Sequence, residues 1–179
     1  MHRLFVALRP PALMRAACLA AMEDGPPGWA WQDEEQLHVT LRFIGEVERP
    51  LAEDVASALG SIRAPAVELA LAGAGWFDQG PRGALFARVA PAQPLAALHT
   101  KIDRMLVTLG LPPERRAYLP HITLARRRRD ATDPADWLER NAGLEGGAGR
   151  LDRLILFESH LSRHGPGYEA VAAYPLGGA

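Results

Sequence analysis

The chain has 179 residues, of which 48% are hydrophobic and 23% are charged, and its formal net charge is −1. This length is enough to bury a substantial core, and the composition excludes disorder over most of the chain. Proteins that wrap long nucleic-acid duplexes usually carry a large positive excess, so near-neutrality favours a small ligand or the end of a strand as the partner.

The single cysteine, Cys18, excludes an intramolecular disulfide, and we expect it to be a buried structural thiol. The first eight residues are too short for a signal-peptide core, and charged residues interrupt every apolar run before it reaches about 18 residues. We therefore expect a cytoplasmic protein without a membrane partner.

Hydrophobic spacing predicts strands and helices that are interspersed along the chain. In chain order, we expect a strand at 3–8, a helix at 12–23, a strand at 37–44, a helix at 50–62, strands at 67–72 and 84–89, a helix at 95–109, a strand at 119–125, a short helix at 134–141, and strands at 151–159 and 168–174. The third helix should face inward with Leu95, Leu98, Ile102, Met105 and Leu109. The glycine-rich stretch 143–149 is predicted to be a loop. The late hairpins do not fit a doubly wound parallel sheet, so we predict an α+β protein with two sheet-containing halves.

A short phrase occurs in each half. Leu37-His38-Val39-Thr40-Leu41 is followed far downstream by Pro120-His121-Ile122-Thr123-Leu124. Side chains alternate between the two faces of a strand, so each histidine shares a face with the threonine two residues later, while the aliphatic residues point into a core. Two such strands facing one cleft would supply two proton carriers and two neutral hydrogen-bond donors.

Other interpretations of the two histidines stay open at this point. Alternating strands are common, so the phrase could recur by chance, and a lone histidine on a strand is usually structural. Two histidines are too few ligands for a typical metal site, and the sequence has neither an HExxH motif nor paired cysteines to complete one. The sequence also lacks GxSxG, GxGxxG and GxxxxGK[ST]. We therefore expect neither a metal nor another cofactor.

General acid–base catalysis fits the twin phrase best. The pKa of a free imidazole, about 6.5, lets one histidine accept a proton while another donates one near neutral pH. Thr40, Thr123 and Arg126 could stabilise the charge that develops on a phosphate. Arg126 lies five residues after His121, so strict alternation turns it to the opposite face; only a strand end, bend or bulge after Leu124 would bring it round. Residues 127–129 are predicted to be a solvated edge. The two motifs are too alike to say which histidine is the acid.

Three aromatic residues near the motifs could stack a terminal base: Phe5, Phe43 and Tyr118. Phe43 shares its parity with Val39 and Leu41, so core packing is the prediction for it. The four tryptophans are predicted to be structural.

These motifs resemble those of the two-histidine (2H) phosphoesterase superfamily. Within it, the chain is similar to the bacterial and archaeal RNA 2′,3′-cyclic phosphodiesterases, long called 2′-5′ RNA ligases. The likeness covers the opening strand at 3–8, Trp31 with residues 37–47, residues 120–126, and the closing hairpin around residues 158–168. Asp33-Glu34-Glu35-Gln36 departs from the family's usual approach to the first histidine, so we expect a different loop shape there and the same chemistry.

The resemblance implies one bilobal 2H phosphoesterase domain over residues 1–179, with two antiparallel sheets facing a central cleft and helices on the outside. It implies metal-independent hydrolysis of a 2′,3′-cyclic phosphate, on RNA 3′ ends or small cyclic nucleotides, to a 2′-phosphate. His38 would donate a proton to the leaving 3′ oxygen and His121 would accept one from water. Thr40, Thr123 and Arg126 would hold the phosphate.

Two rival functions remain. The same site could join 2′-5′-linked RNA ends by the reverse reaction, or the chain could bind a nucleotide or RNA end without turnover. No long heptad pattern appears, and we expect a monomer.

Overall fold

The computed structural model describes residues 1–177; residues 178 and 179 of the predicted domain lie outside the described residues. The strands are β1 (His2–Leu8), β2 (Trp29–Trp31), β3 (Val39–Val47), β4 (Val67–Phe77), β5 (Ala84–Ala90), β6 (His121–Arg127), β7 (Glu145–Leu151), β8 (Arg153–Ser162) and β9 (Gly165–Pro175). The helices are α1 (Ala12–Met22), α2 (Arg49–Leu59), α3 (Ala92–Thr108) and α4 (Ala135–Arg140), with 3-10 turns η1 (Glu34–Gln36) and η2 (Gly80–Arg82). The predicted α+β class is confirmed.

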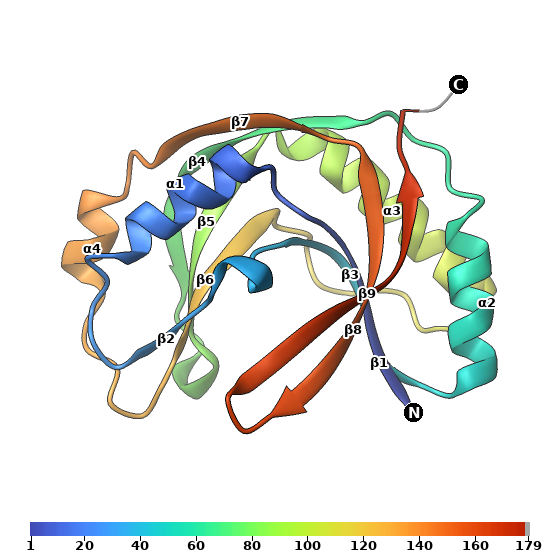
Figure 1. Ribbon diagram of the computed structural model, residues 1–179, viewed down its shortest axis with the longest axis horizontal. Helices are drawn as coiled ribbons and strands as arrows, with labels where there is room; N and C mark the ends of the chain where they lie inside the picture. The colour runs from blue at the N-terminus through green and yellow to red at the C-terminus, as the bar shows by residue number, and fades with distance from the viewer. Residues whose placement is uncertain (178–179) are drawn as a thin grey trace.

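The strands form a curled antiparallel sheet in the order β7-β4-β5-β6-β3-β1-β8-β9, with β2 added to β6. Its two halves meet between β3 and β6, which pair only at Val39 and Ile122. The two predicted sheets are therefore joined into one hydrogen-bonded network by a single narrow junction. In Figure 1, β4, β5 and β6 lie on the left and β1, β8 and β9 on the right, with the helices along the outer rim. Each half contributes one of the two motif strands.

Helix α3 packs its apolar stripe against the sheet beside β3. Its buried positions follow helical spacing: Leu95, Leu98, Ile102 and Leu106. Met105 and Leu109, predicted to face inward, are only partly buried. Leu106 takes the last core position instead, one turn after Ile102.

The glycine-rich stretch predicted to be a loop is in fact an edge strand, β7, which lies directly on α1. A Cβ on Gly147 would stand 2.4 Å from the Cα of Met14, and one on Gly149 would stand 2.5 Å from Cγ of Pro11. The glycines are thus needed for close approach of helix and strand, and composition alone could not separate that role from a loop. The short strand β2 also escaped prediction.

Cys18 is fully buried in α1, as expected, and burial raises the pKa of its thiol from 9.0 to about 12. Among the helices within residues 1–177, none has the length and apolar character needed to cross a membrane.

Candidate active site

The first motif strand, β3, contains a bulge directly after Thr40. Thr40 and Arg42 pair with consecutive residues of β1, so Leu41 has no partner across the ladder. Leu41 and Arg42 are both buried, and alternation resumes one residue late. Phe43 is consequently 57% exposed. The prediction that Phe43 packs in the core was wrong because it assumed unbroken alternation along the strand.

The second motif strand, β6, repeats this bulge at the matching position. Thr123 and Ala125 pair with consecutive residues of β5, which leaves Leu124 without a partner. Leu124 and Ala125 are both buried, and the next side chain, Arg126, is exposed and borders the same hollow as His38. The bulge supplies the departure from strict alternation that Arg126 needs to reach the cleft.

The two histidines are oriented by the same hydrogen bond. Nδ1 of His38 lies 2.7 Å from the carbonyl oxygen of Gln36, and Nδ1 of His121 lies 2.6 Å from that of Leu119. A carbonyl oxygen can only accept, so Nδ1 carries the proton in both rings. In each neutral imidazole Nε2 is therefore the nitrogen with a free lone pair.

Aromatic rings surround His38. Its ring centroid lies 4.9 Å from that of Phe5, 5.2 Å from that of Tyr168 and 6.3 Å from that of Phe157. Tyr168 meets the imidazole edge-on at 86°. These rings replace water around the imidazole with apolar surface, which disfavours its charged form.

The pKa of His38 is lowered from 6.5 to about 4. Desolvation by burial is the main cause; the bond to the Gln36 carbonyl opposes it, while the positive charges of Arg126, His121 and Arg9 lower the pKa further. His38 is therefore neutral near pH 7 when no anion is bound.

His121 also has aromatic neighbours. Its ring centroid lies 5.1 Å from that of Phe77 and 5.3 Å from that of Phe86. Burial lowers the pKa of His121, its bond to the Leu119 carbonyl raises it, and the charge of Arg126 lowers it. The net shift is downward, so His121 is a ready proton acceptor at neutral pH.

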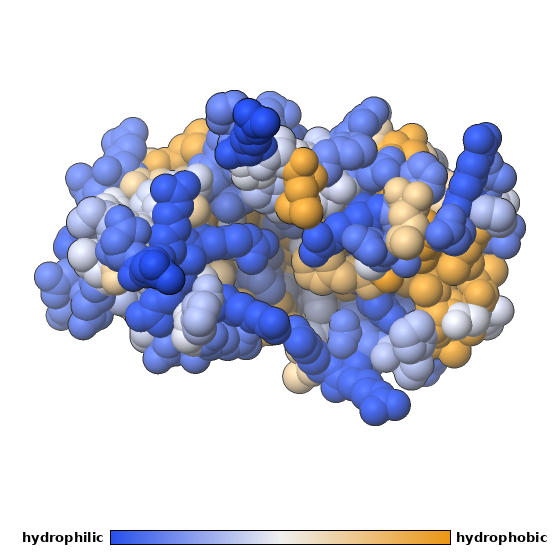
Figure 2. Space-filling model, turned by 90° about the horizontal axis from the view of Figure 1, so that it is seen from below, coloured by the Kyte–Doolittle hydropathy of each residue, from blue (hydrophilic) through white to orange (hydrophobic). Residues whose placement is uncertain are grey.

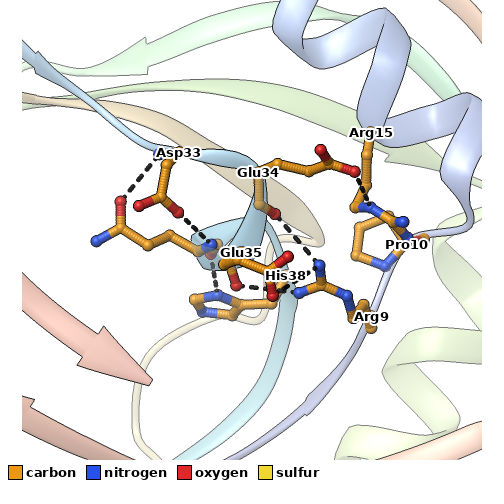
Figure 3. A network of polar contacts seen from close by, with 8 residues as sticks. Arg9, Pro10, Arg15, Asp33, Glu34, Glu35 and His38 are labelled. Atoms are coloured by element: carbon orange, nitrogen blue, oxygen red, sulfur yellow. Dashed lines mark hydrogen bonds and ion pairs between the residues drawn. The ribbon is translucent and has the colours of Figure 1, made fainter. Parts of the chain in front are cut away.

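The turn before the first histidine is firmly built (Figure 3). The main-chain N–H of Gln36 donates to Oδ1 of Asp33 at 2.9 Å, and the N–H of Asp33 donates to Oε1 of Gln36 at 3.0 Å, a reciprocal capping box. Arg9 donates to a main-chain carbonyl of η1 at 3.0 Å, and Arg15 to a carboxylate of η1 at 3.1 Å. Nε2 of Gln36 donates to the carbonyl of Pro166 on β9 at 2.7 Å. Residues 33–36 thus tie the first histidine to Arg9, which follows β1, to helix α1 and to the β8–β9 hairpin.

Two hollows adjoin along the cleft and share Phe43 and Arg116 as lining. The His38 hollow has a volume of about 550 Å³, and the His121 hollow, which also includes Thr40, has a volume of about 410 Å³. Figure 2 looks at the molecule from below Figure 1 and shows a hollow near the middle of this face, with hydrophobic surface inside and hydrophilic side chains around it.

Four guanidinium groups border the His38 hollow: Arg3, Arg82, Arg116 and Arg126. The chain as a whole is nearly neutral. This local concentration of positive charge in a concave site favours an anionic ligand.

The three aromatic candidates for base stacking have different surroundings. Phe5 is only 3% exposed and stacks on Phe157 at 5.2 Å, so it has little surface to offer a base. Tyr118 borders the His121 hollow, but His99 covers one face of its ring, with centroids 4.4 Å apart and planes 2° apart. Phe43 has the most open ring of the three and borders both hollows.

Comparisons with known proteins agree with this geometry. Residues 19–162 match the model of a family described as the 2′-5′ RNA ligase superfamily. The chain belongs to this superfamily. The family resemblance inferred from the twin motifs is thereby confirmed.

Two relatives and two solved structures illustrate the similarity. The RNA 2′,3′-cyclic phosphodiesterase of Aeropyrum pernix is 33% identical over 143 residues, 78% of this chain and 81% of that protein. Its counterpart from Thermus thermophilus is 31% identical over 187 residues, covering 98% of this chain and 91% of that one. Escherichia coli LigT in complex with 3′-AMP superposes with a TM-score of 0.81 at 25% identity, covering 98% of both chains. TT0787 of Thermus thermophilus superposes with a TM-score of 0.79 at 26% identity, again covering 98% of both.

Several residues of the cleft carry no sequence signal that could have predicted them. His99 carries no motif, yet its Nδ1 lies 2.6 Å from the carbonyl of Leu41 because α3 packs against β3. Arg116 and Arg82 reach the His38 hollow from segments without any motif. No local pattern marks these residues, since only the packing of distant segments brings them to the site.

Arg127 is not the solvated edge residue that was predicted. It forms an ion pair with Asp78 at 3.1 Å, and its guanidinium lies 5.8 Å from the ring centroid of Trp29 and 5.6 Å from that of Trp76. These contacts give Arg127 a structural role, and it borders neither hollow. Within residues 1–177, no three His, Cys, Asp or Glu side chains gather where they could hold a metal ion.

Proposed function

We propose that this protein hydrolyses the 2′,3′-cyclic phosphate at the 3′ end of RNA, leaving a 2′-phosphate, without a metal. One observation carries the proposal: two strands from opposite halves of the sheet each place a histidine with a free Nε2 in one of two adjoining hollows, and four arginines border the His38 hollow. The names of the Aeropyrum pernix and Thermus thermophilus relatives support the same reaction.

In this mechanism His121 is the acceptor and His38 the donor. The Nε2 lone pair of His121 takes a proton from a water molecule while the oxygen of that water attacks phosphorus. The bond from phosphorus to the 3′ oxygen breaks, and that oxygen takes the Nε2 proton of His38. His38 is neutral in the free protein, because burial keeps its pKa near 4. The negative charge of the bound phosphodiester stabilises the imidazolium, so His38 gains its proton as substrate binds.

Fixed donors then stabilise the phosphate oxygens as charge builds on them. Thr40 and Thr123 each lie two residues after a catalytic histidine, and we assign their hydroxyls to this task. Arg126 adds a guanidinium that can contact two oxygens at once. Its position after the Leu124 bulge, beside the His38 hollow, supports that assignment.

For the terminal base we propose Phe43, whose ring is exposed between the two hollows. Phe5 and Tyr118 were also predicted to bind substrate. The burial of Phe5 against His38 supports a different contribution, the exclusion of water from the donor. Tyr118 borders the His121 hollow and can contact the substrate only with the ring surface that His99 leaves uncovered.

One observation also favours a second activity, the joining of 2′-5′-linked RNA ends. The hollow on the acceptor side has room for more than water, with a volume of about 410 Å³ and walls that include Phe77 and Tyr118. A 5′-hydroxyl group of a second strand could take the place of water there. We further propose that the chain acts as one bilobal domain, since the cleft needs both halves. Its monomeric state and cytoplasmic location stay predictions.

The test is a hydrolysis assay on an oligonucleotide that ends in a 2′,3′-cyclic phosphate, with a chelator present throughout. We expect turnover to a 2′-phosphate, identified by chromatography against both isomers. His38→Ala and His121→Ala should each lower kcat/KM by about 10²–10⁴-fold. His164→Ala, which removes an exposed histidine from the turn between β8 and β9, is the matched control and should leave kcat/KM unchanged.

Each other result contradicts the proposal in a specific way. Loss of turnover on chelation means that a metal takes part. Full activity in both catalytic variants removes the two-histidine mechanism. Binding of the oligonucleotide without turnover indicates a binding module, and a joined product as the main outcome makes end joining the primary reaction.

A further inference from the structure

Strand β3 pairs with β1 along one edge and with β6 on the other. On the β6 side, beyond that short junction, β3 has no strand partner within the described residues. The pairing with β6 is confined to Val39, whereas β3 continues to Val47. The carbonyl groups on this edge still require hydrogen-bond donors where water is excluded. The carbonyl of Phe43 accepts from the side chain of Arg42, and the carbonyls of Thr40 and Leu41, the residues at the bulge, accept from side chains outside the strand.

The two donors form one unit. The hydroxyl of Tyr118 donates to the carbonyl of Thr40 at 3.0 Å, and Nδ1 of His99 donates to that of Leu41 at 2.6 Å. The rings of His99 and Tyr118 stack almost in parallel, with centroids 4.4 Å apart. Because each ring limits the movement of the other, the pair holds two successive peptide groups in place. Burial also raises the pKa of Tyr118 above its ordinary value, so its hydroxyl remains a donor across the working pH range.

The segments that carry these rings are tied to the same part of β3. His99 belongs to α3, and one turn later on that helix Asp103 accepts a hydrogen bond from Nε of Arg42 at 2.8 Å. Nη2 of Arg42 in turn donates to the carbonyl of Pro112, in the segment that leads to Tyr118, at 2.6 Å. The bulge is thus enclosed by contacts with both segments.

The other half of the site secures its bulge differently. There the carbonyl of Leu124 accepts from the main-chain N–H of Gln32, next to β2, at 2.8 Å. At the β6 bulge the carbonyl accepts from a backbone N–H, whereas at the β3 bulge the carbonyls accept from side chains that border the His121 hollow. The geometry at Thr40 therefore depends on two residues that can be changed without disturbing a strand.

We propose that His99 and Tyr118 are positioning residues that hold the peptide groups around the Leu41 bulge and so direct the Thr40 hydroxyl toward the phosphate. The inference rests on the proposed function, in which Thr40 donates to the bound phosphate. Neither ring exchanges a proton with the substrate. If the carbonyl of Thr40 loses its donor, the bulge relaxes, and the hydroxyl leaves the position in which it stabilises the transition state.

A double-mutant cycle separates positioning from general structural support. Tyr118→Phe keeps the stacked rings and removes only the donor to Thr40, and we expect kcat/KM to fall about tenfold. In a Thr40→Ala background the same change should alter kcat/KM less than about twofold, because there is no hydroxyl left to position. His99→Phe, which keeps a ring but removes the donor to Leu41, should show the same dependence on Thr40.

Tyr174→Phe is the matched control. The hydroxyl of Tyr174 donates to the carbonyl of Ala56 on α2 at 2.7 Å, far from the cleft, so this variant loses the same kind of bond. It should lower the melting temperature about as much as Tyr118→Phe and leave kcat/KM unchanged. An equal loss of activity in Tyr174→Phe would show that the effect of Tyr118→Phe is general destabilisation, and would overturn the inference.

The cycle is repeated on binding of adenosine 2′-monophosphate, measured by calorimetry. Coupling between Tyr118 and Thr40 in affinity supports positioning even if the wild-type protein turns over no cyclic phosphate, an outcome that would reject the proposed function alone. Independent, multiplicative effects of Tyr118→Phe and Thr40→Ala in both measurements overturn the inference while leaving the function intact.

Discussion

The two halves of the site carry the same motif but differ in what surrounds it. Each motif strand has a histidine, a threonine two residues later and a bulge after that threonine. Five residues after the histidine, β3 presents Phe43 and β6 presents Arg126. In the proposed function the repeated histidines exchange protons, Arg126 binds the phosphate and Phe43 binds the base. Equivalent positions of a repeated strand thus carry an aromatic ring in one half and a cation in the other.

The scaffolds of the two histidines also differ. The carbonyl that orients His38 belongs to Gln36, whose side chain is bonded to Asp33 and to Pro166. The carbonyl that orients His121 belongs to Leu119, which is 43% exposed. The loop that orients His38 is held by more hydrogen bonds, and burial lowers the pKa of His38, as suits the donor role proposed for it.

The largest effect expected within this comparison comes from changing Arg126 and Phe43, the residues at the two matching positions. Arg126→Ala should lower kcat/KM about 100-fold, because a cation at the developing phosphate charge is lost. Phe43→Ala should mainly raise KM, by about 5–150-fold, since stacking of a base is worth about 1–3 kcal/mol. Steady-state kinetics on a nucleoside 2′,3′-cyclic phosphate and on ribose 2′,3′-cyclic phosphate distinguish the two.

On the sugar phosphate, which has no base, the Phe43→Ala effect should disappear and the Arg126→Ala effect should persist. Phe43→Trp is the conservative control and should keep KM near its wild-type value on the nucleoside substrate. If Phe43→Ala weakens both substrates equally, the ring does not bind a base.

The second prediction concerns the burial of His38, which should appear in the pH dependence of the free energy of unfolding. Its pKa is about 4 in the folded protein and 6.5 in the reference state, so between these values the unfolded chain binds more protons. The free energy of unfolding should therefore fall as pH drops from 6.5 to 4, with a contribution from His38 of at most about 3 kcal/mol. Urea unfolding over this pH range measures it.

His38→Phe should remove this part of the pH dependence, because no proton is then bound at that position in either state. His164→Phe, on the exposed turn of the last hairpin, controls for the loss of a histidine as such. An unchanged pH dependence in His38→Phe would mean that the imidazole is not desolvated in the folded protein.

The smallest expected effect concerns the support of the orienting carbonyls. Gln36→Ala removes the bonds from that side chain to Asp33 and Pro166 while keeping the main-chain carbonyl, and should lower kcat about threefold to tenfold. Leu119→Ala also keeps its carbonyl and has no such bonds to lose, so kcat should be unchanged. Equal losses in single-turnover kinetics would show that the two histidines are supported alike.

Most of the fold could be predicted because its signals are local. The apolar stripe of α3 and the alternation around Val39 and Ile122 each reflect contacts with the nearest layer of core. Strand β7 was missed because its glycines are selected by contact with α1, far away in the chain. The glycines that are typical of loops are needed there because β7 and α1 pack too closely for larger side chains.

Of the site, the two histidines and two threonines could be recognised because period-two spacing places them on one face before any fold is known. Periodicity could not place Phe43 and Arg126, and only the family resemblance pointed Arg126 to the phosphate, because the bulges at Leu41 and Leu124 depend on how β1 and β5 pair with the motif strands. His99 could not be found at all, since only the packing of α3 against β3 brings it to the carbonyl of Leu41.

The class of fold, the family and the groups that can exchange a proton are readable from the residues alone, because they follow from side-chain chemistry and short-range periodicity. The directions that Arg126 and Phe43 face, the lowered pKa of His38 and the side chains that complete the edge of β3 required the folded chain. Those properties arise from ladder register, desolvation and contacts between distant segments, and no stretch of sequence contains them locally.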